Sequence, residues 1–150
     1  MSDAAPTPEP AADPPVATPP TVLVVDADER TRESIVGILG IRHRFEIVGS
    51  AGHAGAAIAL VASKRPDVIV LDPRLPELPD GIALIRRIRA IHPDARILAV
   101  GWTPILEHDT LAAGADGFVR KTFKPGDLSG AIARCMDVRS VPGTGLRLTE

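Results

Sequence analysis

The chain has 150 residues, of which 45% are hydrophobic and 24% charged, and its formal net charge is −2. This length favours one folded domain, and this composition excludes a chain that is disordered throughout. The charge argues against binding to nucleic acid through bulk positive charge, and no apolar run approaches the roughly 20 residues of a membrane span.

Residues 1–20 differ in composition from the rest of the chain, because seven of them are proline and very few are bulky and apolar. Proline at this density is incompatible with a helix, and such a segment buries too little apolar surface to offset the entropy lost on ordering. We therefore predict a disordered tail over residues 1–20, a folded domain over residues 21–137 and a flexible C-terminal tail over residues 138–150.

From residue 21 the chain alternates between strand and helix patterns. Short apolar runs, typical of strands buried on both faces, occupy residues 22–25, 45–48, 68–71, 97–100 and 118–119. Helical apolar periodicity follows each run, over residues 28–40, 54–63, 82–91, 105–113 and 127–136. Five strands alternating with five helices predict an α/β fold whose doubly wound parallel sheet is covered by helices on both faces.

Polar residues follow the predicted strands at the points where each strand ends. In a parallel sheet these ends share one edge, where ligands usually bind, and here they carry Asp26, Asp72, Gly101 and Lys121. Carboxylates are suitable ligands for Mg²⁺, and an aspartate can also act as a nucleophile toward phosphate. A lysine supplies a positive charge for a phosphoryl group. These residues indicate a small charged site with the parts that phosphoryl transfer needs.

Several short motifs, in order and nearly in spacing, resemble the receiver domain of bacterial response regulators. They are VLVVD at 22–26, PDVIVLD at 66–72, LP at 75–76, DG at 80–81, Pro93 with Arg96, and AGADGFVRK at 113–121. The resemblance covers about residues 21–137. It implies a flavodoxin-like fold, with five parallel strands in the order 2-1-3-4-5 and five helices.

The resemblance also implies a role for individual residues. Asp72 would be the phosphoacceptor, and Lys121 would pair with the phosphoryl group. Mg²⁺ would be held by Asp26, by Asp72 and by the backbone carbonyl of Arg74. Phe118 stands where receivers have a switch aromatic that rotates between exposed and buried states, although it could equally be a core residue.

The chain departs from the family pattern at two positions beside these residues. Ala27 replaces a second acidic residue, which should weaken Mg²⁺ binding. Asp28 is a possible substitute ligand, but it is also well placed to cap the following helix. Gly101 replaces a Ser or Thr that binds a phosphoryl oxygen, so that the hydroxyl of Thr103 or the backbone N–H of Trp102 would have to serve instead.

These features predict an atypical, stand-alone bacterial response regulator of two-component signal transduction, located in the cytoplasm and phosphorylated on Asp72. The phosphoryl group would come from a sensor histidine kinase or a phosphotransfer protein, and the output would be contact with a downstream protein rather than with nucleic acid or a membrane. A homodimer is one option. We expect no enzymatic activity beyond Mg²⁺-assisted self-phosphorylation. Residues 138–150 are too few for an output domain, unless the chain is a fragment and they are a linker.

Two other functions stay open. The departures are also compatible with a receiver-like docking module that works without phosphorylation. A glycine-rich turn formed by Gly49, Gly52 and Gly55 keeps a flavodoxin-like protein for a nucleotide, a flavin or a cobalamin as a further alternative, although it is not the dinucleotide fingerprint.

Two groups of side chains are expected at the surface. The first group is the four histidines, whose spacing is not that of metal ligands: His43, His53, His92 and His108. A basic cluster on one predicted helix indicates either a solvated face or a surface for an acidic partner, and it consists of Arg86, Arg87 and Arg89.

Overall fold

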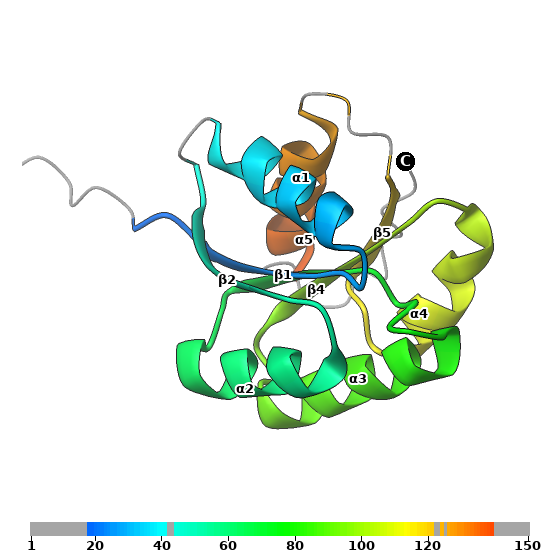
Figure 1. Ribbon diagram of the computed structural model, residues 1–150. Helices are drawn as coiled ribbons and strands as arrows, with labels where there is room; N and C mark the ends of the chain where they lie inside the picture. The colour runs from blue at the N-terminus through cyan, green and yellow to red at the C-terminus, as the bar shows by residue number, and fades with distance from the viewer. Residues whose placement is uncertain (1–17, 42–43, 122–123, 125, 140–150) are drawn as a thin grey trace, which may run out of the picture.

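The computed structural model describes residues 18–41, 44–121, 124 and 126–139. The predicted tails, over residues 1–20 and 138–150, therefore lie almost wholly outside the described residues. Within the described part of the chain, strands and α-helices alternate as the sequence predicts (Figure 1).

Five strands form one parallel sheet in the order β2-β1-β3-β4-β5. They are β1 (Thr21–Val25), β2 (Glu46–Ala51), β3 (Val68–Leu71), β4 (Arg96–Gly101) and β5 (Gly117–Arg120). This arrangement confirms the predicted fold class and strand order. The order places β3 at the centre of the sheet, so that its carboxyl end has neighbouring strands on both sides.

The helices cover both faces of the sheet (Figure 1). They are α1 (Glu29–Gly40), α2 (Ala54–Lys64), α3 (Leu78–Ile91), α4 (Glu107–Ala113) and α5 (Asp127–Arg139). Alternate strand residues point to opposite faces, and this divides the core into two clusters. Leu23 and Val25 of β1 pack on the side of α2 and α3, whereas Val22 and Val24 pack on the side of α1 and α5.

Two helices differ from the sequence-based prediction. Helix α3 begins at Leu78, four residues before the predicted start, because Glu77 and Asp80 form a capping box and the helix accommodates Pro79 in its first turn. The segment predicted as one helix over residues 105–113 is divided into a 3-10 turn, η1 (Pro104–Leu106), and the short helix α4. The proline-rich stretch before residue 82 had indicated a loop, and the capping box extends α3 into it.

Two surface predictions are wrong for one residue each. His92 is 8% exposed, and its Nε2 lies 2.8 Å from the carbonyl oxygen of Pro66. Arg89 belongs to a network rather than to a solvated face, since its guanidinium donates to the carbonyl oxygen of Gly114 and to the Asp116 carboxylate. His43 lies outside the described residues. None of the described helices is long and apolar enough to cross a bilayer.

Candidate functional site

The three charged residues predicted from the strand ends all lie at the carboxyl edge of the sheet. Each continues the backbone ladder one residue beyond its strand: Asp26 N–H donates to Ala51, Asp72 N–H to Val25, and Lys121 N–H to Gly101. These hydrogen bonds are 2.9–3.0 Å long. The backbone that carries the three side chains is therefore held as firmly as the strands themselves.

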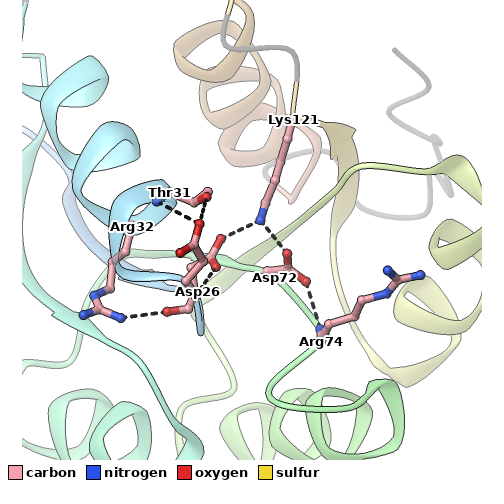
Figure 2. Close-up of polar contacts among 7 residues, drawn as sticks. Asp26, Thr31, Arg32, Asp72, Arg74 and Lys121 are labelled. Carbon is pink, nitrogen blue, oxygen red and sulfur yellow. Dashed lines mark hydrogen bonds and ion pairs between the residues drawn. The ribbon is translucent and has the colours of Figure 1, made fainter.

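The Lys121 ammonium binds both carboxylates. Its Nζ donates to Asp26 Oδ2 at 2.6 Å and to Asp72 Oδ2 at 2.5 Å, and Figure 2 shows it between the two side chains. All three residues are buried, with exposed fractions of 2% for Asp26, 6% for Asp72 and 7% for Lys121. Buried charges are costly unless they are paired, so the lysine stabilises both aspartates. Two carboxylates and one ammonium still leave one negative charge in the cluster.

The second oxygen of each carboxylate binds the backbone. Asp26 Oδ1 accepts from the N–H of Asp28, and Asp72 Oδ1 accepts from the N–H of Arg74, both at 2.9 Å. In both cases the donor lies two residues further along the chain, which is the hydrogen bond of an Asx turn. The local backbone therefore orients each carboxylate and directs its other oxygen toward Lys121.

The donor set fits a magnesium ion that keeps several water ligands. A carboxylate oxygen has more than one acceptor site, so Asp26 and Asp72 can accept further bonds. Within the described residues, no three His, Cys, Asp or Glu side chains are grouped as metal ligands. A cation here would have two carboxylates, a backbone carbonyl such as that of Arg74, and water, which is an ordinary set for Mg²⁺. Ala27 is exposed and supplies no ligand.

Asp28 acts as the N-cap of α1. Its Oδ2 accepts from Thr31 Oγ1 at 2.5 Å and from the Thr31 N–H at 3.3 Å. The hydrogen bond from the Thr31 side chain lowers the pKa of Asp28, and the backbone hydrogen bonds act in the same direction. The carboxylate thus makes the helix-capping contact that the sequence left open as an alternative to metal binding.

The end of β4 and the residues that follow it form a side of the site that carries no charged side chain. Gly101 presents no side chain, and the Thr103 hydroxyl accepts from the N–H of Ile105 at 3.4 Å. Phe118 is only 4% exposed. A β-carbon added to Gly101 would lie 3.2 Å from Cζ of the Phe118 ring, so this ring packs directly against the glycine.

Two contacts at this edge were not predicted from the sequence. The indole ring of Trp102 has its centroid 5.4 Å from Lys121 Nζ, which is a cation–π distance. Arg32 Nη1 donates to the backbone carbonyl of Asp26 at 2.8 Å. The position of Arg32 could have been indicated only by its spacing of one helical turn from Asp28, the N-cap of α1. No local signal in the sequence indicated the position of the Trp102 indole.

Comparison with known proteins gives one consistent family. Residues 22–133 match the family model of the response regulator receiver domain. The chain is 39% identical over 113 residues to the DNA-binding transcriptional activator DevR/DosR of Mycobacterium tuberculosis, covering 74% of this chain and 52% of that protein. It is 32% identical over 109 residues to a protein-glutamate methylesterase/protein-glutamine glutaminase of Anaeromyxobacter dehalogenans, covering 73% of this chain and 30% of that protein. The chain thus spans about half the length of the first relative and less of the second.

Solved structures give the same result. A two-component response regulator of the LuxR family from Aurantimonas sp. SI85-9A1 superposes with a TM-score of 0.73 at 30% identity, covering 81% of this chain and 87% of that one. The receiver domain of NarL from Mycobacterium tuberculosis superposes with a TM-score of 0.72 at 28% identity, covering 79% of this chain and 97% of that one.

Proposed function

The chain belongs to the response regulator receiver domain family, and from this premise we propose that it accepts a phosphoryl group on Asp72 in two-component signalling. One observation carries the proposal: the buried Lys121 ammonium binds Asp72 and Asp26 together at the carboxyl edge of the sheet. In such an arrangement Asp72 would be the nucleophilic carboxylate, Lys121 the fixed positive charge and Asp26 a second acidic ligand.

The chain's own residues support each part of the transfer. Asp72 Oδ2 would form the new bond to phosphorus while the bond from phosphorus to the donor's histidine nitrogen breaks, and Oδ1 stays on the Arg74 N–H. Lys121 would move one hydrogen bond from Oδ2 to a phosphoryl oxygen, where its charge offsets the negative charge of the group. The backbone N–H of Trp102 and the hydroxyl of Thr103 are further candidate donors to that group.

We propose that Asp26, Asp72 and the Arg74 carbonyl hold Mg²⁺, whose charge helps to neutralise the phosphoryl oxygens when it is bound. The binding should be weak compared with a site of three carboxylates. Ala27 supplies none, and Asp28 would have to leave Thr31 and uncap α1 before it could take part. For Phe118, packed against Gly101, we propose the part of the switch aromatic, which would leave this position when the site changes state.

Receiver domains in general interact with histidine kinases and downstream effectors. For this chain we propose that a sensor histidine kinase or a phosphotransfer protein donates the phosphoryl group, and that the protein is located in the cytoplasm. Its output would be contact with another protein, and this protein could be a second copy of the chain. The balance of 17 basic and 16 acidic residues from residue 21 onward supports a protein target better than nucleic acid. Catalysis would be limited to the chain's own phosphorylation.

The test is intact mass after incubation with acetyl phosphate, with and without Mg²⁺. We expect one phosphoryl adduct on the wild type and none on Asp72→Asn. Asp94→Asn is the matched control, because Asp94 is exposed and precedes β4, at the opposite edge of the sheet, so this variant should keep the adduct. If the folded wild type takes no phosphoryl group from acetyl phosphate or from a phosphohistidine donor, the proposal fails. The chain would then be better described as a receiver-like docking module that works without phosphorylation. An absorbance spectrum of the purified protein would reveal a bound flavin or cobalamin.

A further inference from the structure

The position of Trp102 follows from the sheet. Gly101 of β4 is paired with Arg120 of β5, so Trp102 and Lys121 are the next pair beyond the two strands. The Lys121 N–H donates to the Gly101 carbonyl oxygen at 2.9 Å and holds this pair in register. Paired residues of neighbouring parallel strands direct their side chains to the same side. The indole and the lysine side chain therefore meet at the carboxyl edge of the sheet.

The contact between them is with the ammonium group itself. The ring centroid lies 5.4 Å from Lys121 Nζ, while the same nitrogen donates to Asp72 and Asp26. The side chain of Lys121 is only 2% exposed, but Trp102 is 57% exposed. An indole with one side in solvent thus lies next to a cation that solvent scarcely reaches. The negative face of an aromatic ring attracts a cation, which favours this arrangement.

We propose that Trp102 is a positioning residue that covers the Lys121 ammonium and prolongs the lifetime of the phosphoryl group on Asp72. This inference rests on the proposed function. Hydrolysis requires a water oxygen to bond to phosphorus while the bond from phosphorus to the Asp72 oxygen breaks. The Asp72 carboxylate is regenerated, inorganic phosphate leaves with the hydroxyl of the water, and one proton goes to solvent. By holding the ammonium on the phosphoryl oxygens and occupying the space beside it, the indole reduces the access of water.

The experiment compares the rate at which the Asp72 adduct is lost in the wild type and in three variants, after the phosphodonor is removed. Trp102→Ala should shorten the lifetime by about threefold to tenfold, the range that a cation–π contact of ordinary strength accounts for. Trp102→Phe keeps an aromatic face and should restore most of the lifetime. Ile105→Ala is the matched control, because Ile105 is 80% exposed in the neighbouring 3-10 turn, and its lifetime should be that of the wild type.

A second measurement tests the contact without phosphorylation. Only three lysines occur in the chain, Lys64, Lys121 and Lys124, so the Lys121 ε-methylene signals can be assigned by NMR. An indole over the ammonium should shift these signals upfield in the wild type and in Trp102→Phe, and Trp102→Ala should return them to ordinary positions. A Lys121 signal that does not depend on residue 102 overturns the inference.

The outcomes separate this inference from the proposed function. If the wild type acquires no phosphoryl group on Asp72, the proposed function fails and the inference fails with it. If the wild type is phosphorylated and Trp102→Ala loses the group no faster, the inference alone is overturned. A shorter lifetime that Trp102→Phe does not restore also overturns it, because the loss would then reflect the shape of the segment rather than an aromatic face.

Discussion

Replacing Gly81 with alanine should destabilise the protein by acting on the loop that carries the phosphoacceptor. Gly81 lies in the first turns of α3, and a β-carbon there would lie 1.6 Å from the carbonyl oxygen of Pro73 and 2.3 Å from its carbonyl carbon. Real β-carbons essentially never approach another heavy atom within 3.0 Å. Because the obstacle is backbone, the helix and the loop must move apart. Pro73 lies between Asp72 and Arg74, so the movement reaches the hydrogen bond from the Arg74 N–H to the acceptor carboxylate.

The expected magnitude is the difference between two opposing effects. Overpacking a well-packed site costs about 1–3 kcal/mol, and a rigid backbone obstacle places Gly81→Ala at the upper end of this range. Alanine in a helix gains up to about 1 kcal/mol over glycine. The net loss should therefore be about 2 kcal/mol, which lowers the Tm of a domain of this size by roughly 8 °C. Gly37→Ala in α1 should do the opposite, since no described atom beyond the chain neighbours and the helix's own backbone lies within 4 Å of the added carbon.

The assay is urea and thermal unfolding of the two variants beside the wild type, followed by circular dichroism. Gly37→Ala should be more stable than the wild type by about 0.5–1 kcal/mol, and Gly81→Ala should be less stable. Phosphorylation by acetyl phosphate should also be slower in Gly81→Ala, because the Arg74 N–H no longer orients the carboxylate as well. If both alanine variants gained stability equally, the close contact between α3 and the acceptor loop would not exist.

Three further predictions concern the site and its borders. Lys121→Met should cost about 3–5 kcal/mol in urea unfolding, because it leaves two buried carboxylates without their cation, and a loss below 1 kcal/mol would contradict this. Gly101→Ser should lower stability by about 1 kcal/mol and displace the Leu106 side chain and the Phe118 ring, since its β-carbon would lie 3.0 Å from Leu106 Cδ1 and 3.2 Å from Cζ of that ring. Unchanged NMR signals of both side chains would refute this. The Thr31 hydrogen bond lowers the pKa of Asp28 below its ordinary value near 3.8, so this carboxylate stabilises the fold above that pH and ceases to do so as the pH falls through the lower, folded value. The unfolding midpoint of Asp28→Ala should therefore lie below that of the wild type at pH 7, and the two midpoints should converge in stronger acid. A difference between the midpoints that does not change with pH would contradict this prediction.

Apolar periodicity was sufficient to predict the sheet. Every residue of β3 is buried, and its unbroken apolar run is what a strand covered on both faces requires. The boundaries that were missed lie where local hydrogen bonds override the apolar pattern. Glu77 and Asp80 begin α3 earlier than its first apolar stripe indicates, and the turn after Thr103 is 3-10 rather than α-helical.

The residues of the candidate site could be predicted because a parallel sheet brings all of its carboxyl ends to one edge. The proximity of Asp26, Asp72 and Lys121 follows from that rule, although their chemical roles remain proposals. The sequence left Asp28 with two possible roles, as a cap or as a metal ligand. The structure shows it in the cap, because the Thr31 hydroxyl and N–H are both within reach of its carboxylate.

The periodicity of the sequence by itself indicated the fold class and the edge at which the charged residues gather, and the resemblance to the receiver domain family implied the strand order. Only the tertiary structure decided the individual contacts that these side chains make. Lys121 binds Asp26, 95 positions away, and the Trp102 indole lies beside the same ammonium. His92 is buried beside Pro66, which no spacing of the histidines indicated. Such contacts depend on how neighbouring strands and helices pack and on which face each side chain points to. They arise from the assembled sheet rather than from any one segment.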